Sequence, residues 1–203
     1  MNIKLHRTLP SPRLIVVIAC GLLLWSAAHS FAQEVVFNFD PAQTRVEYTL
    51  GDILHTVHGS FQLKNGFIKF DQATGEAGGL IVVDATSGAS GSEGRDHRMH
   101  KEILESQRYP EITFVPRRVQ GQVADQGNSV LAMEGLLTLH GSQHPINIAV
   151  RVNPARDVLN AETQFEIPYV KWGLKNPSTF ILRVSSTVNI RIRASGRLQV
   201  ARE

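Results

Sequence analysis

The alternation of apolar and polar residues along this chain is the feature that most limits its fold. From Val35 onward, apolar and polar side chains alternate one by one over short segments. Such alternation gives a β-strand one apolar face and one solvated face. The segments that show it are 35–39, 46–50, 61–63, 80–82, 131–139, 146–153 and 188–193. The chain is therefore predicted to be all-β.

Short turn sequences separate these segments. Glycine, asparagine and serine gather at residues 65–66, 77–79, 126–128 and 140–142. Such short connections favour an antiparallel meander. We expect about eight strands in a closed, lipocalin-like barrel, because closure removes exposed sheet edges. A sandwich of two sheets would give the same local pattern.

The segment from Ser87 to Pro110 departs from the alternation. Met99, Ile103 and Leu104 in this segment have helical spacing, and a Gly- and Ser-rich stretch precedes them. The spacing predicts a short helical excursion near residues 96–107 that covers one end of the barrel.

The first 32 residues have the pattern of a secretory signal peptide. Basic residues at positions 4, 7 and 13 precede an apolar run over residues 14–28, which is shorter than the ~20 residues of a membrane-spanning helix. Ser30 and Ala32 fit a cleavage before Gln33, and Ala28 and Ser30 fit one before Phe31. We expect residues 1–32 to be removed and residues 33–203 to act as a single domain in the periplasm or outside the cell. An uncleaved N-terminal anchor is the alternative.

Charge and cysteine content exclude several classes of function. The chain has 21 Lys and Arg and 18 Asp and Glu, and the three basic residues of the leader account for the difference. The balanced remainder has no general attraction for nucleic acid. Cys20 is the one cysteine, so a chain without the leader has no disulfide, thiol nucleophile or thiolate metal site. A lipoprotein cleavage at Cys20 is a second alternative for the leader.

The histidines beyond the leader form three pairs along the chain: His55/His58, His97/His100 and His140/His144. Imidazole is a common ligand of zinc, copper and nickel, but no H-E-x-x-H or comparable ligand motif is present. We expect solvated loop histidines and no metal site. No nucleophile–base arrangement or paired carboxylates stand out either, so we expect neither a catalytic residue nor enzyme activity.

A series of short motifs occurs in a fixed order between residues 37 and 194. They are Gly59-Ser60-Phe61, Gly66-Phe67-Ile68-Lys69-Phe70-Asp71, Arg95-Asp96, Tyr109-Pro110-Glu111-Ile112-Thr113-Phe114, Gly135-Leu136-Leu137-Thr138-Leu139-His140-Gly141 and Trp172-Gly173-Leu174. In this order they resemble the YceI-like family of secreted polyisoprenoid-binding proteins. Two positions depart from the family pattern, because Asp52 and Arg98 stand where the family usually has histidine. These departures concern head-group contacts and leave the expected fold unchanged.

The resemblance implies a barrel that binds a long isoprenoid chain in its interior. The candidate lining residues are the inward-facing Leu137, Leu139, Ile148, Val150, Val188 and Ile190; a solid core would show the same pattern. The residues expected around the mouth are Arg95, Asp96, His97, His100, Tyr109 and Trp172.

We therefore expect a periplasmic binding or carrier protein for an amphiphilic isoprenoid lipid with a quinone- or polyprenyl-like tail. The lipid is the expected ligand and partner, with no further cofactor and no nucleic acid. A transient membrane contact is compatible with this function, and the sequence leaves the oligomeric state open. The alternatives are a ligand-free interaction or stress module with a packed barrel, and metal binding through the paired histidines.

Overall fold

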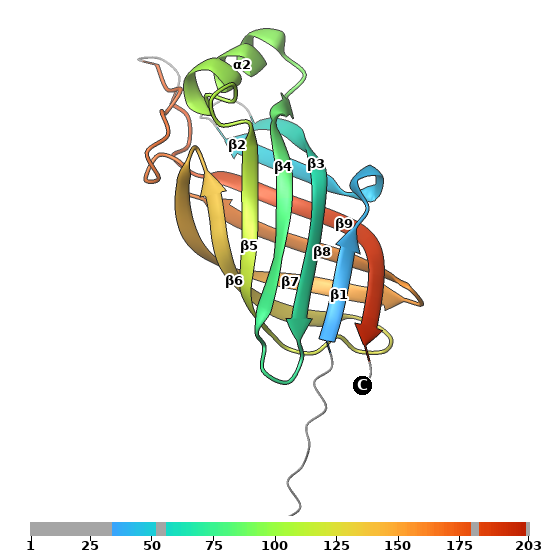
Figure 1. Ribbon diagram of the computed structural model, residues 1–203. Coiled ribbons are helices and arrows are strands. Elements are labelled where there is room, and N and C mark those ends of the chain that lie inside the picture. The colour runs from blue at the N-terminus through green and yellow to red at the C-terminus, as the bar shows by residue number, and fades with distance from the viewer. Residues whose placement is uncertain (1–33, 52–55, 180–182, 202–203) are drawn as a thin grey trace, which may run out of the picture. The chain divides into compact units, whose positions relative to one another are not determined.

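The computed structural model describes residues 34–51, 56–179 and 183–201, which are almost entirely β-structure (Figure 1). The predicted leader, Asp52 and His55 lie outside the described residues. The strands within these ranges are β1 (Glu34–Phe39), β2 (Arg45–Gly51), β3 (Thr56–Asp71), β4 (Ala77–Ala89), β5 (Glu111–Gln120), β6 (Ser129–Leu139), β7 (Ser142–Ala155), β8 (Val158–Ile167) and β9 (Val188–Ala201). Neighbouring strands pair antiparallel throughout.

β1 and β2 together occupy one position in the barrel. Both run antiparallel to β3 and to β9: β1 pairs with the last residues of these two strands, and β2 pairs with their first residues. The other strands follow in the order β3-β4-β5-β6-β7-β8-β9. Because β9 pairs with both β1 and β2, the sheet closes into a barrel of eight strand positions. The closed antiparallel barrel is confirmed, and the sandwich is excluded.

The interruption between β1 and β2 follows from the sequence Asp40-Pro41. Proline has no backbone N–H and cannot continue the ladder. Asp40 Oδ1 instead accepts a hydrogen bond from the backbone N–H of Ala42 at 2.9 Å, at the start of the 3-10 turn η1 (Pro41–Gln43). The backbone N–H of Asp40 donates to the carbonyl of Ser195 at 2.8 Å, so the break stays attached to β9.

Two of the predicted turns are wrong. β3 runs straight through Asn65-Gly66, with a register shift between Leu63 and Asn65 where the strand pairs with β4. A bulge of this kind lets a long strand bend without ending. β4 already begins at Ala77, so residues 77–79 are strand. The predicted turn at 126–128 lies between strands, and so does the one at 140–142 except for Ser142, which is the first residue of β7.

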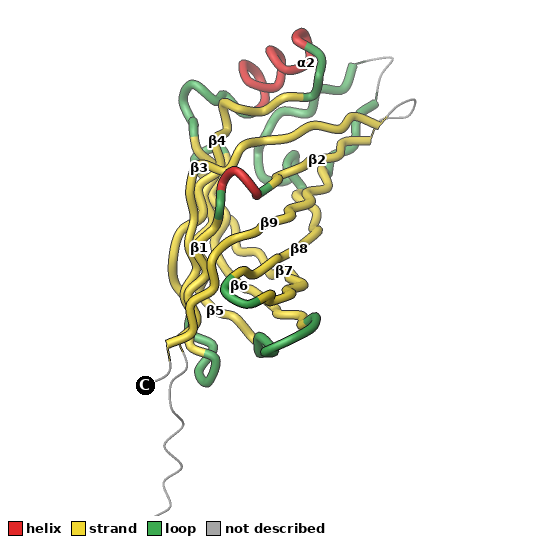
Figure 2. The backbone as a smooth tube through the Cα atoms, turned by 90° about the vertical axis from the view of Figure 1, so that its right-hand side faces the viewer, coloured by secondary structure: helices red, strands yellow, loops and turns green. Residues whose placement is uncertain are grey.

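The predicted excursion is formed by α2 (Glu93–Arg98) and the π-helical turn η2 (Met99–Ile103), which lie at the end of the barrel opposite the end of β9 (Figure 2). The helix begins earlier than residue 96, because extended Ser92 precedes a first turn that carries two acidic residues. It ends at Ile103, and Glu105 then takes a left-handed conformation with φ 45°. No helix within the described ranges is long and apolar enough to cross a bilayer.

Side chains fill the interior of the barrel at the end away from α2. Val35 and Val119 are 0% and 1% exposed there, and they belong to one cluster of buried residues with Phe37, Phe70 and Met133. These side chains face inward because of the alternation along their strands. The remaining free volume of the barrel therefore lies nearer α2.

We predict that Gly196→Ala destabilises the barrel. A Cβ at Gly196 would lie 2.1 Å from the backbone oxygen of Asn38, because β9 and β1 approach closely at this point. The backbone must shift to relieve that overlap, which costs about 1–3 kcal/mol in the free energy of unfolding. Urea unfolding measures the loss. The matched control is Gly78→Ala, where the nearest atom is Lys69 Cε at 3.7 Å; equal stability of the two variants would contradict the prediction.

Candidate functional site

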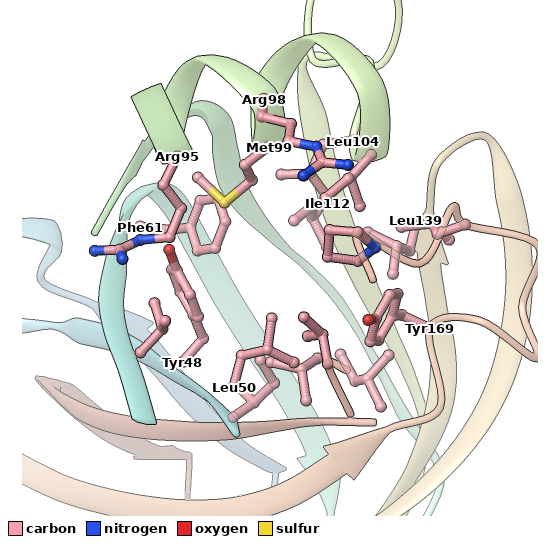
Figure 3. Close-up of a pocket in the computed structure, with 18 of the residues that line it drawn as sticks. Tyr48, Leu50, Phe61, Arg95, Arg98, Met99, Leu104, Ile112, Leu139 and Tyr169 are labelled. Carbon is pink, nitrogen blue, oxygen red and sulfur yellow. The ribbon is translucent and has the colours of Figure 1, made fainter. Parts of the chain in front are cut away.

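A cavity of about 460 Å³ lies inside the barrel beneath α2 and η2 (Figure 3). Its wall consists of inward-facing side chains of six strands. They are Tyr48 and Leu50 from β2, Val57 and Phe61 from β3, Ile112 from β5, Leu139 from β6, Ile167 from β8, and Val188 and Ile190 from β9. Apart from the hydroxyl of Tyr48, this wall presents only carbon atoms of the side chains to the cavity.

The helical excursion covers the cavity from above. Its contributions are Gly94, Arg95, Arg98, Met99, Ile103 and Leu104, which recur at intervals close to a helical turn. A second segment, the mouth loop (residues 168–179 and 183–187), closes one side with Tyr169, Leu174, Pro177 and Val184. The cavity is thus apolar within the barrel and carries its two guanidinium groups at the helix (Figure 3).

Hydrogen bonds of Ser90 connect the start of α2 to the end of β4. The carboxylate of Asp96 accepts hydrogen bonds from the hydroxyl and from the backbone N–H of Ser90, the latter at 2.9 Å. Arg95 Nε donates to Ser90 Oγ at 2.7 Å, and its Nη2 donates to the Ser90 carbonyl at 3.1 Å. Burial acts to raise the pKa of Asp96, but the Ser90 hydrogen bonds and the Arg95 charge outweigh it and lower that pKa below 3.8.

Glu102 joins the helical excursion to the mouth loop. Its Oε2 accepts a hydrogen bond from Lys175 Nζ at 2.9 Å, and the same oxygen lies 3.5 Å from Arg98 Nε. The hydrogen bond and charge of Lys175 lower the pKa of Glu102, and the charge of Arg98 adds to this effect. The pair is exposed to solvent, so it connects the two segments without burying either charge.

Two tyrosine hydroxyls reach the cavity from different sides. Tyr169 donates its hydroxyl hydrogen to the carbonyl of Ser185 at 2.6 Å, which ties the two ends of the mouth loop together. Burial raises the pKa of Tyr169. Burial also raises the pKa of Tyr48, and the charge of Asp96 adds to the shift. Both phenols are therefore neutral at physiological pH.

The predicted lining residues separate into two groups along the barrel. Leu139, Val188 and Ile190 line the cavity. The other three lie deeper, as buried members of the core: Leu137, Ile148 and Val150. They face inward as predicted, but they stand below the cavity rather than around it.

The predicted mouth residues of the helix have distinct roles. Arg95 lines the cavity, Asp96 holds Ser90, and the side chain of His97 is exposed to solvent. His100 Nε2 lies 2.8 Å from the carbonyl oxygen of Gly88, so this nitrogen donates, and Nδ1 lies 3.0 Å from the hydroxyl of Ser106. The structure therefore does not bring His97 and His100 to a common site.

Tyr109 and Trp172 each pack against a histidine of the β6–β7 hairpin. The Tyr109 ring lies 4.5 Å from that of His140, whose Nε2 is 3.0 Å from Glu105 Oε1. The Trp172 ring stacks on His144 with centroids 4.0 Å apart and an interplanar angle of 2°. Burial lowers the pKa of His144, so its ring is uncharged near neutral pH.

The histidine pairs share no common ligand position in the described part of the chain. His140 and His144 have different neighbours, and His58 Nδ1 lies 3.2 Å from the hydroxyl of Thr49. No group of three or more His, Cys, Asp or Glu side chains is arranged to hold a metal ion within residues 34–51, 56–179 and 183–201.

Several cavity residues are absent from the predicted lining. Tyr48 and Phe61 belong to the recognised alternation, and Met99 and Leu104 to the recognised helical spacing, so a signal for them was present. In the mouth loop, Leu174 belongs to the recognised Trp172-Gly173-Leu174 motif, whereas Pro177 and Val184 follow neither period.

We predict that acidification loosens α2 before it unfolds the barrel. The lowered pKa means that charged Asp96 stabilises the folded attachment at pH values above 3.8, its ordinary value, and that this contribution is lost as the pH falls through the lower folded value. Hydrogen exchange of amides 92–98, corrected for intrinsic rates, should show the increased opening. Asp96→Asn should open this segment already at neutral pH and remove the pH dependence. Equal protection in both proteins at both pH values would contradict the assignment.

Comparison with solved structures supports the fold. BcnA of Burkholderia cenocepacia superposes with a TM-score of 0.64 at 17% identity, covering 78% of this chain and 99% of BcnA. A polyisoprenoid binding domain of Saccharophagus degradans superposes with a TM-score of 0.60 at 14% identity, covering 84% of this chain and 100% of that domain. A YceI protein of Campylobacter jejuni gives a TM-score of 0.56 at 17% identity, covering 71% and 86% of the two chains.

Sequence comparisons agree with the structural ones. A UPF0312 protein of Vibrio campbellii is 26% identical over 169 residues, which cover 81% of this chain and 87% of the relative. A UPF0312 protein of Vibrio parahaemolyticus is 26% identical over 186 residues, which cover 89% and 96%. A family profile described as a YceI-like domain matches residues 37–195, nearly the whole of the barrel. The chain therefore belongs to the YceI-like domain family.

Proposed function

We propose that this protein binds or carries an amphiphilic isoprenoid lipid of the quinone or polyprenyl type, with the apolar tail in the cavity beneath α2, and that it catalyses no reaction. The observation that carries the proposal is the cavity itself, about 460 Å³ of apolar volume inside an otherwise packed barrel. The similar domain from Saccharophagus degradans, described as polyisoprenoid binding, supports the choice of ligand class.

The physical basis of binding is the burial of hydrocarbon. Each buried CH₂ group contributes up to ~0.8 kcal/mol, and loss of chain freedom offsets part of this gain. The wall offers almost no polar group that could form a hydrogen bond with the ligand. The shape and volume of the cavity therefore determine which lipid tails bind. The polar head group of the lipid is recognised at the helix, where Arg95 and Arg98 line the cavity.

The N-terminal sequence supports a site of action outside the cytoplasm. Residues 1–32 have the basic start, apolar run and small residues of a secretory signal peptide. In this proposal the signal directs residues 33–203 to the periplasm or the medium, where the barrel carries or sequesters its lipid.

Mass spectrometry of the intact protein tests the proposal. Protein produced with its own leader, then delipidated and exposed to quinones and prenyl alcohols, should take up one lipid. Ile190→Trp should abolish this uptake, because the larger ring occupies the cavity that Ile190 lines. Val130→Trp is the control, since Val130 is 62% exposed on the outer face of β6. Absence of uptake by the native protein across the panel would favour a ligand-free interaction module.

We predict that Arg98 discriminates between head groups. A charge-assisted hydrogen bond to a phosphate is worth roughly 1.5–3 kcal/mol, so Arg98→Gln should weaken binding of geranylgeranyl phosphate about tenfold or more. Binding of geranylgeraniol should change little. Arg108→Gln serves as the control, because Arg108 is an exposed arginine near the mouth that does not line the cavity. Equal weakening of both ligands by Arg98→Gln would show that the side chain acts by packing alone.

A further inference from the structure

The lower limit of the cavity can be located on six strands. On each strand the last cavity-lining residue is followed, two positions deeper on the same face, by an inward-facing apolar residue that does not line the cavity. These deeper residues, here called the floor layer, are Val46, Leu63, Phe114, Leu137, Phe165 and Ile192. They come from β2, β3, β5, β6, β8 and β9 respectively.

Pairing between strands brings four of the floor-layer residues together as two pairs. Val46 stands directly opposite Ile192 in the register of β2 and β9, and Phe114 stands opposite Leu137 in that of β5 and β6. Opposite residues of an antiparallel pair lie on the same face, with side chains in contact distance. Floor-layer side chains are therefore adjacent within two strand pairs, while Val46 also stands opposite the cavity residue Phe61 in the register of β2 and β3.

Aromatic rings supply much of the bulk of the floor layer. Phe114 lies over Gly135, where a Cβ would come within 2.4 Å of the ring, so the glycine makes room for it. Phe165 stands directly opposite Ile190, which lines the cavity. Beneath these rings the barrel is filled, with Met133, Val150 and Val35 among its buried residues.

We propose that the floor layer is a chain-length stop, which limits the enclosed part of the ligand to a few isoprene units. The inference rests on the proposed function and adds a substrate preference: prenyl chains up to about geranylgeranyl length are enclosed, and further units remain outside. The cavity volume of about 460 Å³ agrees with this limit, since it falls in the lower part of the ~300–1,000 Å³ range of small-molecule pockets.

Competition between prenyl alcohols of increasing length tests the stop. Delipidated protein is exposed to an equimolar mixture of geraniol, farnesol, geranylgeraniol and geranylfarnesol, and occupancy is read by native mass spectrometry. Occupancy should rise with each unit that is enclosed and should not rise from geranylgeraniol to geranylfarnesol. Phe165→Ala should deepen the cavity and raise the ratio of geranylfarnesol to farnesol by roughly tenfold or more, the effect of burying another unit.

Comparison between variants in the same mixture removes differences in solubility among the alcohols. Phe70→Ala is the matched control, because it removes the same ring from the packed end of the barrel, 5% exposed. Phe165→Leu, a smaller truncation, gives a shift in the same direction if Phe165→Ala does not fold. A wild-type occupancy that keeps rising to geranylfarnesol, or an equal shift in the Phe165 and Phe70 variants, would overturn the stop alone. Failure of the native protein to bind any of the alcohols would overturn the proposed function as well.

Discussion

The pairing of β9 with both β1 and β2 is the interaction on which the rest of the structure depends. It closes the sheet, so the strands have no free edge and the inward faces meet around one axis. An open sheet with the same alternation would expose Tyr48, Leu139 and Ile190 to water on one side. Closure converts these residues into the wall of an internal cavity. The Asp40-Pro41 break, attached to Ser195, allows one interrupted strand position to serve this closure along its full length.

The alternation predicted which faces point inward, but it carried no information on depth along the barrel. Leu139 and Leu137 have the same period and the same face, yet one lines the cavity and the other lies under it. The difference depends on the side chains that other strands place beside them. Phe114, for example, reaches over Gly135 on the neighbouring strand. Such contacts between distant segments cannot be read from a local period, which is why half of the predicted lining residues proved to be core.

A turn predicted from local sequence was also wrong where pairing between strands continued through it. Asn65-Gly66 is a common hairpin sequence, but the pairing of β3 with β4 on both sides of it keeps the strand continuous through a bulge. The mouth residues were predictable as a group, because the excursion and the Trp172 segment both interrupt the alternation. Their individual roles were not predictable: His100 and His144 look alike in the sequence, while one forms hydrogen bonds to Gly88 and Ser106 and the other stacks on Trp172.

The exposed contact of Glu102 with Lys175 makes the connection over the cavity sensitive to salt. This contact joins the helical cover to the mouth loop, and its charges remain in solvent, where dissolved ions screen them. Separation of the two segments at this point therefore costs little free energy, whereas the wall below consists of apolar side chains. In the proposed function, salt therefore lowers the cost of separating the helical cover from the mouth loop, whereas the contacts of the apolar wall with a lipid tail involve no charges that salt could screen.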